Sequence, residues 1–251
     1  MAGGTRWRMA AIICLSIGLV TAVAAEQKPP RPSAEAPVAI SEDVAHLLEL
    51  GKLLMGQNNP AYAAAPEPLT FEKRNDAGKQ ALRTLQTVVK RSPQFAQGWL
   101  WLGIALTETL EYTKDAPKGR PLVTNVTLTD GIEAFHRAYQ YDAVNEDCVK
   151  YYGDALIEYR RDFDGAIQLW SQYLPVAHTD LQRVMALVQT SRAYLNKAYF
   201  GKGKLRAGEV KRCYQRACDC TQQAAKLCPN AQDVKEMQSL LENNRKTLIG
   251  N

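Results

Sequence analysis

The sequence predicts an all-α protein built from about four helical hairpins and a final helix. After residue 40, apolar residues recur at i, i+3, i+4 and i+7, and no stretch keeps the strict alternation typical of a half-buried strand. One short pattern of large residues around a glycine occurs in three separate segments. Each of these segments is followed by a second helical segment, and several of the second segments end at a proline. With 251 residues, 46% of them apolar, the chain can bury a core and form one or two domains.

The N-terminal segment has the pattern of an export signal. Arg6 and Arg8 precede a run without charge from residue 10 to residue 25, and Ala24 and Ala25 suit a signal peptidase. A retained membrane anchor is the alternative, but the apolar run has 16 residues, whereas a spanning helix needs about 20. We therefore expect residues 1–25 to be removed and the mature protein to be periplasmic or secreted, without a membrane span.

A proline-rich linker is expected between the signal and the folded domain. Residues 26–40 are mostly small or polar and contain four prolines, Pro29, Pro30, Pro32 and Pro37, a composition typical of an extended linker. The folded domain is then predicted over residues 41–251.

The first helices of the first three predicted hairpins share one pattern: a large residue, then a large residue and a glycine three and four positions later, and another large residue three positions after the glycine. The three examples are Leu47, Leu50, Gly51 and Leu54; Trp99, Leu102, Gly103 and Leu106; and Val149, Tyr152, Gly153 and Leu156. A glycine inside a helix costs about 1 kcal/mol relative to alanine. Its recurrence at one place therefore predicts the close approach of a second helix.

The second helix of each hairpin carries a small residue followed four positions later, in most cases, by a large one. The four examples are Ala81, Leu85 and Val88; Gly131, Phe135 and Ala138; Ala166, Trp170 and Tyr173; and Ala217, Thr221 and Ala224. Proline lacks an amide hydrogen and disfavours helix in the residue before it. Pro93, Pro175 and Pro229 should therefore end the first, third and fourth hairpins.

These residues resemble the tetratricopeptide repeat (TPR), whose pattern is W-x₂-L-G-x₂-Y, then A-x₃-F, then P over 34 residues. Trp99, Leu102 and Gly103 match its first helix, and Gly131 and Phe135 match its second. The fit is weaker elsewhere. Leu106 stands where the repeat prefers Tyr, and Ala143 stands where it prefers Pro. In the fourth unit the first helix offers only Leu187, Ser191 and Tyr194 at the corresponding positions. The resemblance covers about residues 42–230, with residues 233–248 as a capping helix. A generic α-solenoid of helical pairs is the alternative.

The resemblance implies a TPR-like α-solenoid that acts as a protein-interaction scaffold and holds a peptide or partner protein in its concave groove. The residues expected in the core are Leu47, Trp99, Leu102, Tyr152 and Leu156. The candidate partner-binding residues on the other side of the first helices are Leu48, Lys52, Leu100, Ile104, Glu108, Lys150, Asp154 and Glu158. A carrier with a small ligand or glycan in a closed helical pocket is the alternative function.

No sequence motif of catalysis is present, so we expect no enzyme activity, no catalytic residues, no cofactor and no metal. The histidines His46, His136 and His178 lie far apart in the chain, and none of the common hydrolase, phosphate-binding or metalloprotease motifs occurs. A net charge of +5 and a pI of 8.8 fall short of a typical nucleic-acid-binding domain. Neither the identity of the partner nor the oligomeric state follows from the sequence.

Three further features leave alternatives open. Five cysteines follow the signal segment, Cys148, Cys213, Cys218, Cys220 and Cys228, and we favour packing roles over a disulfide to another element or a metal site. Six cations between residues 202 and 216 form either solvated surface or an anion-steering patch. Insertions at residues 57–70, 112–130 and 200–205 fall within hairpins and predict a joint lip at one edge of the stack.

Overall fold

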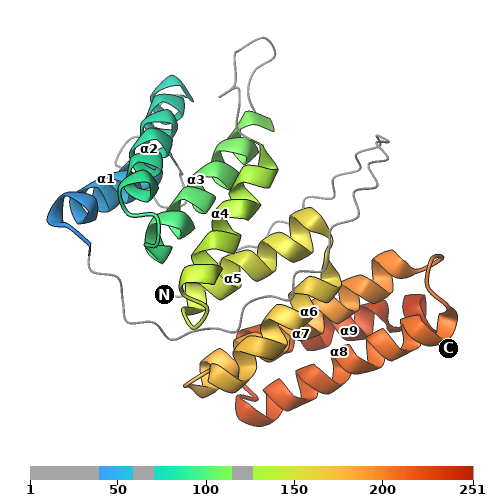
Figure 1. Ribbon diagram of the computed structural model, residues 1–251. Coiled ribbons are helices and arrows are strands. Elements are labelled where there is room, and N and C mark those ends of the chain that lie inside the picture. Colours follow the sequence, from blue (N-terminus) through green and yellow to red (C-terminus); the bar gives the residue numbers. More distant parts are fainter. Residues whose placement is uncertain (1–39, 59–70, 115–126, 251) are drawn as a thin grey trace. The chain divides into compact units, whose positions relative to one another are not determined.

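The computed structural model describes residues 40–58, 71–114 and 127–250 (Figure 1). The chain divides into two units, residues 1–31 and 32–251, and all the described residues belong to the second unit. The expected signal peptide, the expected linker up to residue 39 and most of the first two insertions lie outside the described residues.

The described part of the chain is helical, with turns between the helices. The helices are α1 (Glu42–Asn58), α2 (Phe71–Arg91), α3 (Ala96–Lys114), α4 (Leu128–Tyr141), α5 (Glu146–Ala155), α6 (Phe163–Tyr173), α7 (Asp180–Gly201), α8 (Ala207–Leu227) and α9 (Gln232–Ile249). A π-helical turn, Leu156–Arg160, extends α5, and a 3₁₀ turn, Leu174–Val176, follows α6. The strand-like pairing in this part is limited to an isolated bridge between Lys202 and Leu205. The predicted all-α class is confirmed.

Consecutive helices pack as hairpins, and the hairpins stack. The pairs α1–α2, α3–α4, α5–α6 and α7–α8 are in contact, and α2–α3, α4–α5, α6–α7 and α8–α9 join each pair to the next element. The first helices also contact each other directly at α1–α3 and α3–α5, and α9 contacts α7 as well as α8. Four helical pairs followed by a closing helix, with first helix against first helix, form the predicted TPR-like α-solenoid.

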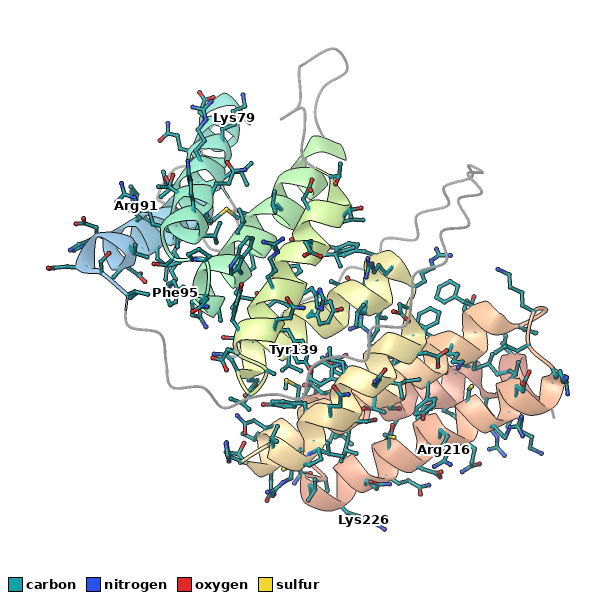
Figure 2. All side chains as sticks on the ribbon, viewed as in Figure 1. Lys79, Arg91, Phe95, Tyr139, Arg216 and Lys226 are labelled. Carbon is teal, nitrogen blue, oxygen red and sulfur yellow. The ribbon has the colours of Figure 1, made fainter. Side chains whose placement is uncertain are left out.

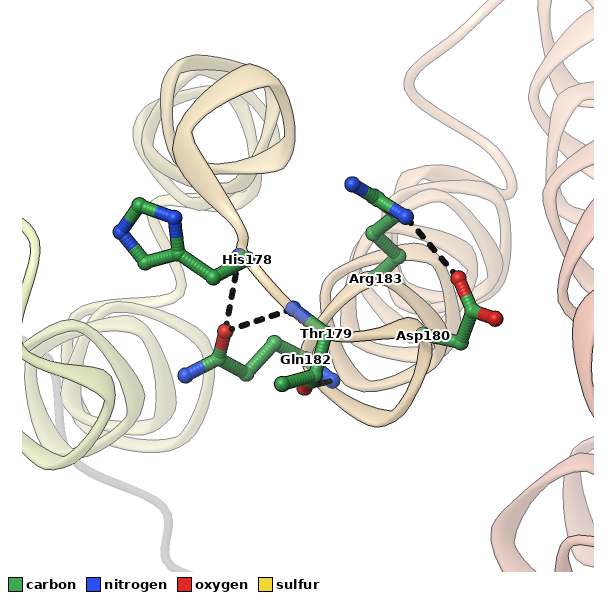
Figure 3. Close-up of polar contacts among 5 residues, drawn as sticks. All are labelled: His178, Thr179, Asp180, Gln182 and Arg183. Atoms are coloured by element: carbon green, nitrogen blue, oxygen red, sulfur yellow. Dashed lines mark hydrogen bonds and ion pairs between the residues drawn. The ribbon is translucent and has the colours of Figure 1, made fainter.

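Capping residues fix where several helices begin. Figure 3 shows the start of α7, where the backbone amides of His178 and Thr179 donate to Oε1 of Gln182 at 2.9 and 3.1 Å. In return the Thr179 hydroxyl accepts from the Gln182 amide at 3.2 Å, which completes a capping box. Arg183 and Asp180 form an ion pair on the first turn at 2.9 Å. Thr127 and Asp130 make the same reciprocal cap at the start of α4.

The three glycines of the repeated pattern lie where a second helix comes close. A Cβ atom placed on any of them would stand between 2.5 and 2.7 Å from a large side chain of the partner helix, a distance that real Cβ contacts do not reach. The pairs are Gly51 with Leu85, Gly103 with Phe135, and Gly153 with Trp170. In each pair the large side chain is the central residue of the second-helix pattern. The predicted reason for the glycines is therefore confirmed.

Candidate functional site

The first helices form one face whose central positions are equivalent from repeat to repeat. The residue after each repeat glycine, or after Ser191 in the fourth unit, is in turn Lys52, Ile104, Asp154 and Arg192. Ile104 is 5% exposed, whereas the three charged residues are each partly exposed. We call the face that α1, α3, α5 and α7 present at these positions the inner face.

At the first seam of the inner face a cation covers an aromatic ring. The Lys52 ammonium lies 5.4 Å from the centroid of Trp101, which belongs to α3 and is itself partly exposed. The ammonium also pairs with Glu49 one turn earlier at 2.7 Å. A cation over a tryptophan face is attracted by the ring quadrupole. This contact joins α1 to α3 through groups that solvent can reach.

At the seam between α5 and α7 one arginine holds two carboxylates. Arg192 donates from Nη1 to Oδ1 of Asp154 at 3.1 Å and from Nη2 to Oε1 of Glu158 at 2.5 Å. The Arg192 side chain is 28% exposed and Asp154 is 22% exposed, so the charge-assisted bonds are partly shielded from water. Glu158 reaches this position from the π-helical turn that follows α5. The seam is polar and charged, unlike the apolar packing on the opposite side of the same helices.

Burial raises the pKa of Asp154 to about 6, and the neighbouring Glu158 carboxylate acts in the same direction. The positive charges of Arg192 and Lys150 lower it, but they do not compensate for the loss of water. Asp154 is therefore ionised at neutral pH at a cost to the folded state, and it gains a proton in mildly acidic solution.

The eight predicted partner-binding residues divide into four that are accessible, three that are buried and one whose side chain is not described. Lys52, Lys150, Asp154 and Glu158 lie at the surface or partly exposed on the inner face. Leu48, Leu100 and Ile104 are only 5, 2 and 5% exposed and belong to an apolar core cluster, so a partner could not contact them without moving a helix. Glu108 lies in α3, but its side chain is outside the described residues.

The expectation for Leu48, Leu100 and Ile104 needs this correction because their helices have more neighbours than one hairpin supplies. Leu48 lies on α1, which contacts both α2 and α3, and the other two lie on α3, which contacts α1, α2, α4 and α5. Of the residues expected in the core, Leu102 and Leu156 are buried. Leu47, Trp99 and Tyr152 are partly buried against the core clusters.

Trp99, the residue that matches the repeat pattern best, stabilises the start of α3. Its indole nitrogen donates to the carbonyl of Pro93 at 2.6 Å, which ties the start of α3 to the turn that precedes it. The Arg137 guanidinium lies 4.6 Å from the centroid of its ring. The ring thus contacts the turn before its own hairpin and the second helix of that hairpin.

Sequence reasoning missed Trp101 and Arg192. Trp101 precedes a repeat glycine by two positions, on a turn where the pattern has no requirement, so nothing marked it. Arg192 follows Ser191, the residue at the glycine position of the fourth unit, and that equivalence to Asp154 was a signal that could have found it.

The described residues contain no group of three or more His, Cys, Asp or Glu side chains that could hold a metal ion. Burial raises the pKa of the Cys148 thiol to about 12. Cys148 and the four later cysteines are all free thiols and form no disulfide. No helix within the described ranges is both long and apolar enough to cross a bilayer.

No family model matches the chain, and the search of curated proteins finds no match. A solved structure described as "MamA RS-1 ArsTM double mutant" is 13% identical to the chain over 83% of it and 99% of that protein, with a TM-score of 0.43.

Proposed function

We propose that the protein is an exported interaction scaffold that binds a peptide or an extended partner segment along the inner face. The observation that carries the proposal is that three of the four equivalent positions on successive first helices, Lys52, Asp154 and Arg192, hold partly exposed charged groups, and that the partly exposed Trp101 lies beside Lys52. Stacked helical pairs leave such an extended surface because each pair buries its apolar side against the next.

The charges on the inner face favour a partner of mixed character. Lys52 and Lys150 supply positive charge, Glu158 is exposed and only part of its charge is balanced by Arg192, and Trp101 offers an apolar surface. A partner segment that combines apolar residues with charges of both signs can pair with all of these groups, whereas a uniformly charged polymer cannot. The proposal includes no catalytic activity and no nucleic-acid binding.

Site-specific photo-crosslinking tests the proposal. A photo-reactive residue at position 52 or 150 should yield crosslinked partner bands from cells that express the full chain, and mass spectrometry should identify them. The control carries the same residue at position 226, near the end of α8, where the Lys226 side chain points away from the fold (Figure 2). Equal crosslinking from positions 150 and 226 would contradict binding on the inner face.

Charge reversal supplies the second arm. Lys52→Glu combined with Lys150→Glu should abolish capture of the crosslinked partner and keep the helical circular dichroism. Neither residue is buried, so the fold should survive the change. Retained capture would move the binding surface elsewhere.

A further inference from the structure

The turns of the third and fourth hairpins line a common cavity of about 340 Å³. One wall comes from the chain between the π-helical turn and the first turn of α6, with Arg161 and Phe163. The other comes from the end of α7 and the turn before α8, with Phe200, Lys204 and Leu205. The insertion of the fourth hairpin, residues 200–205, thus lies beside the turn of the third hairpin. The joint lip of all three insertions stays a prediction, because most of the other two insertions lies outside the described residues.

Arg161 enters this cavity from an unusual backbone conformation. Its φ angle is 54°, and no other non-glycine residue within the described ranges has a positive φ angle. It ends the π-helical turn, where its amide donates to the carbonyl of Leu156. Glycine is the usual residue at such a left-handed helix end because a Cβ atom is unfavourable there. An arginine at this point therefore needs an explanation other than the turn itself.

The Arg161 side chain is placed against an exposed aromatic surface. Its guanidinium lies 4.8 Å from the centroid of the Phe200 ring, and Phe200 stacks on Phe163 with centroids 5.8 Å apart and planes at 9°. Phe200 is 44% exposed and its neighbour Tyr199 is 50% exposed. Phe200 lines the cavity and Tyr199 does not, so one accessible aromatic side chain next to a cation leaves apolar area uncovered at the cavity.

The two acids of the cavity are already engaged, and two of its cations are not. Asp164 pairs with Lys197, and Asp162 accepts the Gly165 amide at 2.9 Å as the cap of α6. Within the described part of the chain, Arg161 and Lys204 have no carboxylate partner. The cavity lining thus carries three cations, Arg161, Lys197 and Lys204, against two carboxylates, a net charge of +1 beside aromatic rings.

We propose that this cavity is a second binding site, separate from the inner face, for an acidic peptide segment in which an aromatic residue stands next to a carboxylate. The aromatic side chain packs on Phe200, and the carboxylate pairs with Arg161 and Lys204. The volume lies near the lower end of ligand pockets, about 300 to 1,000 Å³, which suits a side chain from a partner.

The probe is a synthetic peptide, Gly-Ser-Glu-Phe-Asp-Tyr-Glu-Ser-Gly with blocked ends, titrated into the full mature chain by calorimetry. We expect saturable binding that an analogue with Gln and Asn in place of the acids loses by about tenfold or more. Amide resonances of Gly165 and Gly201, which border the cavity, should shift on addition of the acidic peptide. Equal binding of the neutral analogue would overturn the proposal.

Variants separate the site from the fold. Arg161→Gly removes the cation but suits the backbone, so it should weaken peptide binding about tenfold while the melting temperature does not fall. Phe200→Ala should weaken binding similarly. Lys226→Ala makes the same change of charge at the far end of α8 and should bind as the wild type does. Unchanged affinity of Arg161→Gly would overturn the proposal.

Two further arms test other occupants. Phenylacetate alone, if it binds as tightly as the peptide, would show a small-molecule site in place of a peptide site. Vesicles of phosphatidylglycerol that bind the chain through Arg161 while the peptide does not would show a membrane contact instead. Lys52→Glu with Lys150→Glu should leave peptide binding unchanged, so this result does not depend on the function proposed for the inner face.

Discussion

The hydroxyl oxygens of Ser191 and Thr221 lie 2.8 Å apart at the centre of the fourth hairpin. Both side chains are buried, and the Ala217 carbonyl accepts a hydrogen bond from the Ser191 hydroxyl at 2.7 Å and from the Thr221 hydroxyl at 3.0 Å. They occupy the places that a glycine and a large side chain take in the other three hairpins. The fourth hairpin therefore replaces an apolar close contact with a polar one at the same position.

Ser191→Ala should lower the free energy of unfolding by about 0.5 to 1.5 kcal/mol, because one buried hydrogen bond between α7 and α8 is lost. Urea denaturation followed by circular dichroism measures the change. Thr87→Ala is the control, since its hydroxyl bonds only to the Arg83 carbonyl within its own helix, and its effect should stay within about 0.5 kcal/mol. Equal effects of the two changes would contradict a role for Ser191 in helix pairing.

Gly103→Ala should destabilise the protein although alanine favours helix. The new Cβ atom would meet the Phe135 ring at 2.5 Å, and overpacking of this kind costs about 1 to 3 kcal/mol. Gly56→Ala is the matched control in α1, because nothing lies within 4 Å of its Cβ position, and it should stabilise by up to about 1 kcal/mol. Opposite shifts in melting temperature are the expected result. Stabilisation by both changes would show that the Phe135 ring does not pack closely against position 103.

Cys148 should resist thiol reagents in the folded protein. Burial raises the pKa of its thiol to about 12, so hardly any thiolate is present at pH 8, and its side chain is 0% exposed. Mass spectrometry after brief treatment with iodoacetamide should find Cys148 unmodified in buffer and modified in guanidinium chloride. Cys220, which is partly exposed, is the internal comparison. Rapid modification of Cys148 in buffer would show that α5 opens readily.

The hairpins were predictable because each glycine and its large partner are separate, local signals in the sequence. Gly153 and Trp170 each stand out without knowledge of the other, and the fold then brings them together. The burial of Leu100 was not predictable in the same way. Helical spacing shows which side of α3 it occupies, but not that α1 and α5 both pack against α3.

The candidate sites were predicted less completely, for two physical reasons. Arg192 pairs with Asp154 across 38 positions of sequence, and side-chain pairs of that kind leave no local pattern. Arg161 adopts a left-handed conformation at the end of a helix, where glycine is the usual residue, so the sequence did not indicate this conformation. The charged residues Lys52 and Lys150 could be placed at the surface because their side chains are costly to bury.

Arg192→Met should destabilise the protein at pH 7.5 by about 1 to 3 kcal/mol. The arginine holds Asp154 and Glu158 together, and without it two carboxylates face each other with less water than they have in the unfolded chain. Methionine keeps much of the side-chain volume, so the loss reports charge more than packing. Arg212→Met, on the exposed side of α8, is the control and should change stability by less than about 0.5 kcal/mol. Denaturation in urea at fixed pH measures both variants.

Asp154→Asn should make the protein more stable at neutral pH, by an amount that depends on pH in a defined direction. Burial raises the folded-state pKa of Asp154 from its ordinary value of 3.8 to about 6. Below pH 3.8 the carboxyl is protonated in both states and has no effect on pH dependence. As the pH rises towards 6, the unfolded chain releases this proton while the folded chain retains it, so the wild type loses stability. The loss approaches about 3 kcal/mol above pH 6, since each unit of pKa shift corresponds to about 1.4 kcal/mol.

Asparagine cannot ionise, so the stability of the Asp154→Asn variant should exceed that of the wild type most at pH 7.5 and progressively less at pH 6 and pH 4.5. Urea denaturation at those three pH values measures the difference, with Glu242→Gln on the exposed side of α9 as a control that should stay within about 0.5 kcal/mol throughout. A difference that does not change with pH would show that the folded state does not hold the proton of Asp154.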